Sequence, residues 1–370
     1  MKDLSTLRVA IVHDWLIGGG AEQVVLELHR MFPEAPIYTS YATKTWQATL
    51  DGKVITGYLQ YWPFSKLRKF LPVLRGWWFS HLDFTGYDLV ISSSGNGEAK
   101  GVRVPSGTVH VCYCHTPTHY YWRHYDQYLK FPGFGAMDPL ARLGLRLLVG
   151  PLRRRDYTYA QRPDYFIANS THIQNDIKTY YGRDAVVIHP PVDVARFRAA
   201  ATNPTRSGCV TMGRQAPYKR TNLIVAACNQ LSLPLKVIGR GPDHQQLVAM
   251  AGAHTTFLVD VSDEAMPAQL ASAEVFLFAA HEDFGIAPVE ALAAGTPVIA
   301  YKAGGALDYI EPGKTGLFFD EQTEDSLAAA LKTFSPSAFD RAAISRSSEQ
   351  FSARAFQEKL KDFLTSLPDK

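Results

Sequence analysis

Two glutamates with seven residues between them are the most specific chemical pattern in this chain. Glu282 and Glu290 flank a turn predicted at Phe284-Gly285, and Pro288 is tolerated in the first turn of the helix that follows. Glu282 is therefore expected in a loop and Glu290 inside a helix. Carboxylates there can accept hydrogen bonds from the hydroxyls of a sugar or a ribose. The alternative is that Glu290 only complements the helix dipole and Glu282 is only solvated.

Phosphate-binding groups are predicted beside these glutamates. The helix would present the backbone amides of Gly285, Ile286 and Ala287, and a helix N-terminus attracts anions. Arg214 ends a predicted strand and Lys219 precedes a predicted helix. A forked Arg and a mobile Lys together suit a diphosphate. The alternative for these two cations is a solvated basic loop, because exposed charge is the norm.

A run of three glycines is a further candidate for phosphate binding. Gly18, Gly19 and Gly20 separate a predicted strand from a helix that begins near Ala21. Glycine lets the backbone approach a ligand closely, and the following helix offers N–H groups. The run matches neither the dinucleotide-binding fingerprint nor the P-loop. A purely structural turn is an equally good interpretation of these residues alone.

A histidine is predicted at the end of a strand in the first half of the chain. His115 could donate to a sugar hydroxyl or stabilise developing charge there. His119, four residues on, raises the alternative of a metal pair. However, Thr116-Pro117 disfavours a regular helix between the two histidines, and the sequence places no third ligand. A catalytic metal site usually has three protein ligands, so we expect no metal.

The elements that must position these residues follow a simple pattern, in which short apolar runs alternate with helix-length periodic segments. Such alternation predicts an α/β protein whose parallel sheets are covered on both faces. The predicted strands are 7–13, 87–92, 109–114, 165–169 and 186–190, then 208–213, 235–239, 255–259, 275–279, 297–301 and 316–319. The candidate residues fall in strand-to-helix loops, at the carboxyl ends of strands, where open parallel sheets bind ligands.

The proline pair Pro190-Pro191 indicates a linker between two such series of strands. The length of 370 residues suits two or three domains at ~100–200 residues each. We predict two facing Rossmann-like domains, residues 1–190 and 205–350, with the active site in the cleft between them.

Charge and aromatic residues are unevenly divided between the halves. Residues 1–200 hold 23 Lys+Arg against 16 Asp+Glu, a balance of +7, whereas residues 201–370 hold 15 against 19, a balance of −4. All six Trp and 15 of the 18 Tyr lie in the first 200 residues. The two halves are therefore expected to meet different partners.

The four cysteines are predicted to be buried small hydrophobic residues in a reducing compartment. Cys112 and Cys114 lie along a predicted strand and are expected to point to opposite faces. The N-terminal apolar run 7–12 is too short for a signal peptide, and no apolar run reaches the ~18–20 residues that span a bilayer. We expect a cytoplasmic protein that is not integral to a membrane.

Six segments together resemble a known family. They are MGRQAPYKRTNLIVAA, IGRGP, EDFGIAPVEALAAGTPVIAYKAGGALDYI and TGLFF in the second half, and IVHDWLIGGGAEQVVLEL and YCHTPTHYYW in the first. This combination is highly specific and covers roughly residues 8–333. It resembles the retaining glycosyltransferases of family four, which have the GT-B fold. Within that family it is most similar to bacterial mannosyltransferases that build O-antigen and exopolysaccharide.

The resemblance implies roles for the candidates of the second half. Arg214 and Lys219 would bind the donor diphosphate. Glu290 would bind the ribose hydroxyls, and Glu282 the hydroxyls of the donor sugar. The amides that would face the sugar or diphosphate are those of Gly285, Ile286 and Ala287.

The resemblance also implies roles for the first half. Gly18, Gly19 and Gly20 would lie against the phosphates and the acceptor, and His115 would contact the transferred sugar near the reacting centre. The helix at about 353–370 would cross back to the first domain. Such enzymes need no metal and no cofactor besides the nucleotide diphosphate sugar, for which GDP-mannose is favoured. His115 and Glu282 are our predicted catalytic residues.

Two acid-free stretches in the first half predict contact with a membrane. Residues 52–82 mix five basic residues with Trp, Tyr and Phe, and residues 139–155 carry five arginines beside leucines. This mixture suits an anionic headgroup layer. Nucleic acid is not expected, because no nucleic-acid-binding signature accompanies the charge. The alternative is an ordinary core helix with a solvated basic face.

Together these patterns predict a retaining, metal-independent hexosyltransferase. It would move mannose to a lipid-linked or polysaccharide acceptor in cell-envelope glycan synthesis, such as that of lipopolysaccharide, at the inner face of the cell membrane. Two alternatives stay open: a nucleotide-sugar epimerase of related fold, and a non-catalytic protein that binds a glycan or nucleotide.

Overall fold

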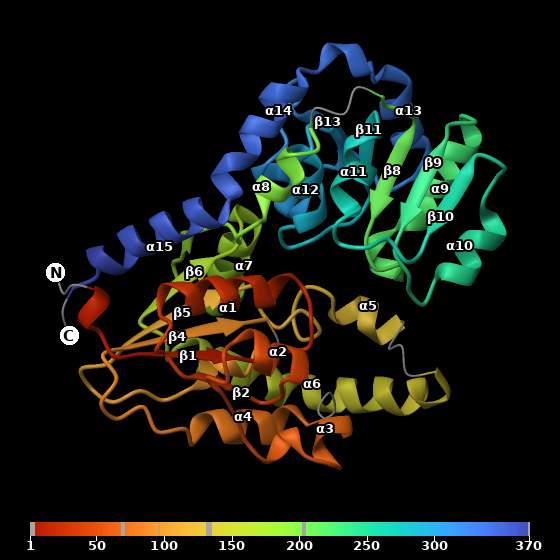
Figure 1. Ribbon diagram of the computed structural model, residues 1–370. Coiled ribbons are helices and arrows are strands. Elements are labelled where there is room, and N and C mark those ends of the chain that lie inside the picture. The colour runs from red at the N-terminus through yellow and green to blue at the C-terminus, as the bar shows by residue number, and fades with distance from the viewer. Residues whose placement is uncertain (1–3, 68–70, 96, 131–134, 202–204, 369–370) are drawn as a thin grey trace. The chain divides into compact units, whose positions relative to one another are not determined.

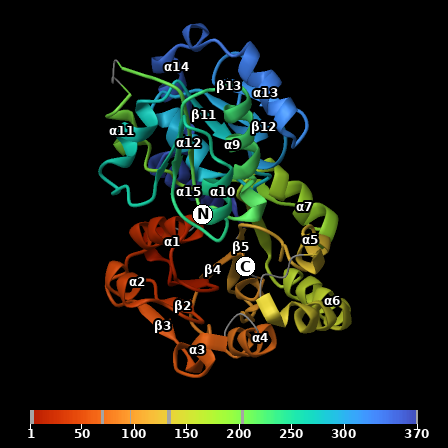
Figure 2. The same ribbon diagram turned by 90° about the vertical axis from the view of Figure 1, so that its right-hand side faces the viewer.

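The chain divides into two units, Met1–Pro190 with Gln357–Lys370 (unit 1) and Pro191–Phe356 (unit 2). The computed structural model describes residues 4–67, 71–95, 97–130, 135–201 and 205–368. In each unit, helices cover a parallel sheet (Figures 1 and 2). The predicted α/β class with two Rossmann-like domains is confirmed.

Unit 1 contains a seven-stranded sheet in the order β3-β2-β1-β4-β5-β6-β7. Its strands are β1 (Val9–His13), β2 (Ile37–Thr39), β3 (Val54–Thr56), β4 (Leu89–Ser94), β5 (Val109–Cys114), β6 (Tyr165–Ala168) and β7 (Val186–Val187). The sequence pattern does not predict β2 and β3, because a run of three residues is too short to show a period.

The helices of unit 1 lie on both sides of this sheet, with α1 and α4 on opposite sides (Figure 1). They are α1 (Gly20–Met31), α2 (Lys44–Thr49), α3 (Phe64–Leu67), α4 (Pro72–Ser80), α5 (Tyr125–Lys130), α6 (Asp138–Ala160) and α7 (Thr171–Tyr181), with α15 (Ala353–Ser366) from Gln357 onward.

All four cysteines are buried and free, but the prediction for two of them is wrong. Cys112 and Cys114 lie in one apolar cluster with Ile177 and Tyr181 of α7 rather than on opposite faces of the sheet. The reason is that strand positions two residues apart point to the same face.

Unit 2 contains a six-stranded sheet in the order β10-β9-β8-β11-β12-β13. Its strands are β8 (Cys209–Met212), β9 (Leu235–Ile238), β10 (Thr255–Leu258), β11 (Val275–Phe278), β12 (Val298–Tyr301) and β13 (Gly316–Phe319). One apolar core lies under α8 (Val194–Arg198), α11 (Met266–Ala271), α12 (Ile286–Ala293) and α14 (Arg341–Ser347). The other lies under α9 (Thr221–Gln230), α10 (His244–Met250) and α13 (Glu324–Thr333).

Strand order reverses once in each sheet, between β1 and β4 in unit 1 and between β8 and β11 in unit 2. Loops that leave the carboxyl ends of strands at such a reversal diverge to opposite sides of the sheet, which leaves a crevice for ligands. The loops after β1, β8 and β11 carry the glycine run, the Arg214–Lys219 segment and Glu282.

A buried carboxylate ties α6 to the loop that follows β5. Asp156 Oδ1 accepts from Lys100 Nζ at 2.6 Å and from Thr118 Oγ1 at 2.8 Å. Asp156 Oδ2 accepts from Trp122 Nε1 and Tyr181 Oη, both at 2.7 Å. Lys100 and Asp156 are each at most 4% exposed, so this network holds in place the loop in which His115 lies.

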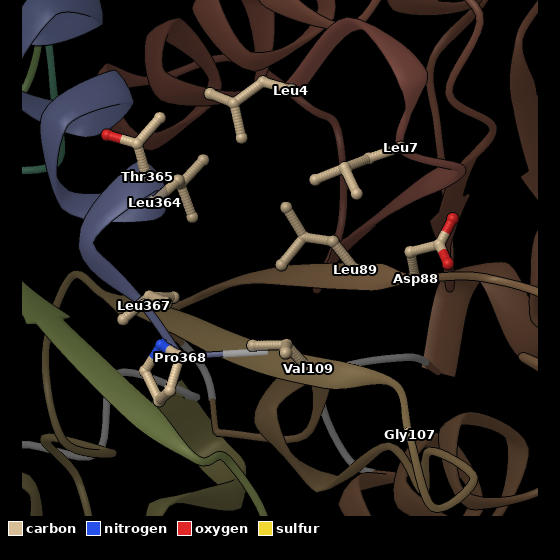
Figure 3. A pocket seen from close by; sticks show the side chains of 10 residues that line it. All are labelled: Leu4, Leu7, Asp88, Leu89, Gly107, Val109, Leu364, Thr365, Leu367 and Pro368. Carbon is tan, nitrogen blue, oxygen red and sulfur yellow. The ribbon is translucent and has the colours of Figure 1, made fainter. Parts of the chain in front are cut away.

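A pocket lies at the other end of the same sheet, near the first residues of β4 and β5 (Figure 3). Leucines of the N-terminal segment and of α15 point into it. Its lining is Leu4, Leu7, Asp88, Leu89, Gly107, Val109, Leu364, Thr365, Leu367 and Pro368. None of the predicted site residues lines this pocket.

Candidate functional site

An ion pair joins two of the predicted residues of unit 2. The Lys219 ammonium contacts the Glu282 carboxylate, although the residues are 63 positions apart. Lys219 follows β8 and Glu282 follows β11, and these strands are neighbours at the reversal of strand order. Both side chains keep about a fifth of their surface exposed. The fold therefore brings a mobile cation and a carboxylate to one point at the ligand-binding edge of the sheet.

Glycines hold the Glu282 loop in place. The Gly305 amide donates to the Glu282 carbonyl at 2.9 Å. A Cβ on Gly304 would lie 2.2 Å from that carbonyl oxygen, and Gly304 has a φ of +66°. The segment after β12 thus packs directly on the glutamate loop, which local sequence patterns do not reveal.

The helix α12 begins where the sequence predicts it. Gly285 precedes it with a φ of +88°, and a Cβ there would lie 2.9 Å from the buried Tyr309 hydroxyl and 3.1 Å from Phe278. Only glycine meets both demands. The amides of Ile286 and Ala287 therefore begin this eight-residue helix, and the amide of Gly285 comes directly before them, just beyond Glu282.

Glu290 lies inside α12 and is half-buried. Burial raises the pKa of its carboxyl to about 7. The Arg196 cation acts against this rise, whereas the Asp193 and Asp263 carboxylates add to it. Glu290 therefore changes charge near neutral pH, which an exposed glutamate does not do.

Arg214 lines a pocket of unit 2 together with Lys219. Arg214 itself is exposed. The pocket lies beneath the ends of β8 and β9 and reaches β11. Its lining is Thr211, Met212, Gly213, Arg214, Gln215, Lys219, Thr221, Ile224, Val237, Ile238, Phe278 and Ala279.

The glycine run of unit 1 is held by a glutamate that the sequence did not single out. Glu22, in the first turn of α1, accepts from the amides of Gly18 at 2.9 Å and Ile17 at 3.2 Å. The φ of Gly18 is +119°, a backbone conformation that residues with a side chain rarely adopt, so a glycine is required at this position. The Gly18 amide thus bonds within the loop, while Gly19 directly precedes α1 and Gly20 is its first residue.

His115 directly follows β5 and is 9% exposed. Burial and the nearby His13 ring lower the pKa of His115 to about 3. The ring is therefore neutral at physiological pH, and a neutral imidazole can still donate a hydrogen bond to a sugar hydroxyl, which is one of its two predicted roles. Asn169 Nδ2 donates to the His115 carbonyl at 2.9 Å and fixes the backbone there.

His13 and Ser93 lie beside His115 and were not predicted as site residues. Ser93 Oγ is 2.8 Å from His115 Nε2 and 3.0 Å from His13 Nδ1. His13 ends β1, and this position at the end of a strand is the same feature of the sequence that predicted His115.

The two acid-free stretches come together on one side of unit 1. They include β3, α3, α4 and part of α6, and a Cβ on Gly76 of α4 would lie 2.4 Å from Arg155 of α6. Large apolar side chains of both stretches are exposed, up to 76% for Trp62 and 68% for Leu147. The others are Ile55, Tyr61, Leu67, Val73, Trp77, Leu140, Leu143 and Leu148. We call these ten residues the apolar surface of unit 1.

One basic residue of these stretches is not on that surface. Arg75 is 1% exposed and pairs with the buried Glu98, at 3.0 Å from Nη2 to Oε2. Its guanidinium also lies over the Trp15 ring, 4.8 Å from the centroid. Arg75 therefore anchors the loop after β4 instead of facing a headgroup layer. Arg68, Lys69 and Phe70, also part of the predicted contact, lie outside the described residues.

The residues that the structure describes contain no cluster of three or more His, Cys, Asp or Glu side chains arranged to hold a metal ion. Among the helices that the structure describes, none is both long and apolar enough to cross a bilayer.

Two Rossmann-like domains with these loops define the GT-B class of glycosyltransferase fold. Residues 18–196 match the family model described as Glycosyltransferase Family 4, and residues 196–351 match the model described as glycosyl transferases group 1. Together the two matches place the chain among the family-four glycosyltransferases.

Curated relatives align with part of the chain. A GDP-mannose-dependent alpha-(1-6)-phosphatidylinositol monomannoside mannosyltransferase of Mycolicibacterium smegmatis is 27% identical over 248 residues, 54% of this chain and 65% of that protein. A D-inositol 3-phosphate glycosyltransferase of Mycolicibacterium gilvum is 30% identical over 208 residues, 49% of this chain and 47% of that protein. The chain thus aligns with about half to two thirds of the length of these relatives.

Solved structures match over nearly the whole chain. The crystal structure of Anabaena HepE in complex with UDP superposes with a TM-score of 0.70 at 18% identity, and covers 98% of this chain and 100% of that chain. This likeness establishes the fold.

Proposed function

We propose that the protein is a retaining glycosyltransferase that moves mannose from GDP-mannose to a lipid-linked glycan acceptor. The observation that carries the proposal is the Lys219–Glu282 pair beside the N-terminus of α12. A cation, a carboxylate and a row of helix amides at one strand reversal suit a diphosphate joined to a sugar. Mannose and a lipid acceptor are supported by the relative that is GDP-mannose-dependent and acts on a phosphatidylinositol monomannoside.

Donor binding would require Lys219 to exchange partners. In the structure its ammonium neutralises Glu282. A diphosphate carries more negative charge than one carboxylate, so it would attract the ammonium and leave the Glu282 oxygens to accept from sugar hydroxyls. Arg214, which is exposed at the same pocket, would add a second cation.

The chemistry would then be mostly positioning and charge. The leaving group is a nucleoside diphosphate, and its growing charge would be stabilised by Lys219, Arg214 and the amides of α12, as donors do in an oxyanion hole. The sugar would pass through an oxocarbenium-like state. We propose a front-face displacement in which the leaving phosphate oxygen helps to deprotonate the acceptor, with no metal ion involved.

The deciding experiment is a screen of nucleotides followed by an assay. GDP is expected to raise the Tm more than UDP or ADP, because a tight ligand stabilises the folded state by mass action. GDP-mannose with a lipid-linked glycan should then give an α-linked product, unchanged by EDTA. Stabilisation by UDP alone would refute the choice of GDP. Interconversion of the donor sugar without acceptor would mark an epimerase instead.

The affinity for GDP is expected to rise with pH around neutrality. Glu290 would accept ribose hydroxyls best as a carboxylate, and its pKa is raised to about 7. Binding should therefore strengthen up to about tenfold from pH 6 to pH 8. Titration calorimetry at both pH values measures this. The Glu290→Gln variant should show no such dependence; an equal slope in both proteins would contradict the ribose assignment.

The raised pKa of Glu290 also makes the free energy of unfolding depend on pH. The folded pKa of Glu290 lies above the unfolded value near 4.5, so the stabilising contribution of protonation is present below pH 4.5 and is lost as the pH rises through 7. Glu290→Gln should therefore be more stable relative to the wild type at pH 8 than at pH 5.

We further propose that the apolar surface of unit 1 rests on an anionic membrane, at the cytoplasmic face. Flotation with phosphatidylglycerol vesicles at low salt tests this. The double change Trp62→Ser with Leu147→Ser should lower vesicle binding roughly tenfold or more, because the wild-type Trp62 and Leu147 would each bury an apolar side chain in the membrane. Val248→Ser, at a residue of unit 2 that is 47% exposed, is the control and should bind like the wild type. Absence of wild-type binding would remove the proposal.

A further inference from the structure

Three neighbouring strands of unit 1 bring two histidines to one serine. His13 ends β1, Ser93 lies opposite it in β4, and His115 follows β5. The order of these strands is β1-β4-β5, and the reversal of strand order falls between the first two. His13 is 3% exposed, Ser93 is fully buried and His115 is 9% exposed. The group therefore lies at the ligand-binding edge of the sheet.

The proton on the His13 ring can be assigned from its partner. His13 Nδ1 lies 2.9 Å from the Ser93 carbonyl oxygen, which can only accept. Nδ1 of His13 must therefore carry a proton and donate. The same N–H also lies 3.0 Å from Ser93 Oγ, so it cannot accept the proton of the Ser93 hydroxyl.

The Ser93 hydroxyl proton then has one destination. Within the described part of the chain, Ser93 Oγ has two hydrogen-bond partners, His13 Nδ1 and His115 Nε2. Because the first is a donor, Ser93 donates to His115 Nε2 at 2.8 Å. The opposite arrangement would leave a buried hydroxyl proton without an acceptor, which is costly. A neutral ring whose Nε2 accepts must hold its proton on Nδ1.

We propose that Ser93 is a positioning residue that holds the His115 ring in the neutral tautomer with its proton on Nδ1. Among the residues that the structure describes, no group bonds to His115 Nδ1, so its N–H stays available to a ligand. His13 orients Ser93, and Ser93 orients His115. Insofar as the proposed function holds, His115 serves the transferred sugar as a hydrogen-bond donor and not as the proton acceptor of the reaction.

Nitrogen NMR of the whole protein tests the tautomer without any substrate. The probe is the chain labelled with ¹⁵N at its 12 histidines, with His115 assigned by a His115→Gln variant. At pH 7.5 the His115 signals should show a protonated Nδ1 and an unprotonated Nε2. A protonated Nε2 overturns the proposal, and this wild-type spectrum decides even where a variant fails to fold.

A matched pair of variants tests the role of Ser93. Ser92 Oγ makes a second buried contact of the same kind, 2.8 Å from His110 Nε2, one position earlier on β4 and so on the other face. Ser93→Ala should shift the His115 signals towards mixed tautomers and lower kcat about 10- to 100-fold, with the donor KM within about twofold. Ser92→Ala should leave the His115 signals and kcat unchanged.

The outcomes separate this proposal from the proposed function. Unchanged His115 signals in Ser93→Ala would refute the positioning role. If the wild-type protein shows the expected tautomer but transfers no sugar, the proposed function is refuted and the positioning role of Ser93 is not. Equal loss of kcat in both serine variants, with unchanged His115 signals, would reduce Ser93 to a structural residue.

Discussion

Replacing Lys219 by alanine is expected to lower kcat/KM about 100- to 1,000-fold, the loss usual when one donor to a developing charge is removed. The ammonium that would offset the charge of the leaving diphosphate is then missing, and GDP should also bind more weakly. Steady-state kinetics and calorimetry measure both effects. Lys219→Arg should recover part of the activity, and Lys332→Ala, at an exposed position of α13, should match the wild type.

Replacing Glu282, the partner of Lys219, is not expected to weaken GDP binding. Glu282→Gln removes the carboxylate that holds Lys219 in the structure, so the ammonium is free for a diphosphate. GDP should therefore bind at least as tightly to Glu282→Gln as to the wild type, while kcat falls because the sugar loses a carboxylate. Unchanged turnover in Lys219→Ala, or weaker GDP binding in Glu282→Gln, would contradict the proposed exchange of partners.

Replacing Asp156 by alanine is expected to destabilise unit 1 by about 3–5 kcal/mol, the cost of leaving a buried charge without its partner. Lys100 would keep an ammonium that is 1% exposed, and the acceptors of Thr118, Trp122 and Tyr181 would be lost with it. Urea unfolding followed by tryptophan fluorescence measures this in unit 1 alone, because all six Trp lie in the first 200 residues.

An exposed ion pair of the same unit is the control for Asp156. Lys53 and Glu34 are 2.8 Å apart, and their side chains are 37% and 89% exposed. Glu34→Ala should leave the free energy of unfolding close to that of the wild type, because solvent screens such pairs. Equal midpoints for Asp156→Ala and Glu34→Ala would show that the buried network contributes no more than a surface contact.

The position of each candidate along the chain could be predicted from the sequence. Runs such as 109–114 and 275–279 are apolar enough to be strands, and a residue that follows such a run lies at a carboxyl end whatever the rest of the fold does. His115 and Glu282 were found in this way. The same rule points equally to His13, which ends β1 and lies beside His115.

Burial of individual charges could not be predicted. Arg75 lies in an acid-free stretch and counted towards a basic surface, but its partner Glu98 is 23 residues away and lies beyond that stretch. Glu22 likewise holds the amides of Ile17 and Gly18 through a bond that only the folded loop creates. A charge run in the sequence says nothing about partners that come from other elements.

The sequence by itself thus determined two doubly wound units and the loops that carry the candidate site, because hydrophobic period and turn residues act over a few positions. Only the tertiary structure decided which side chains meet: Lys219 with Glu282, and Ser93 with His13 and His115. Those contacts depend on strand order, β1-β4-β5 and β8-β11, which joins segments 22 to 80 residues apart. Pairing of strands that far apart is set by how whole faces pack, and no local pattern encodes it.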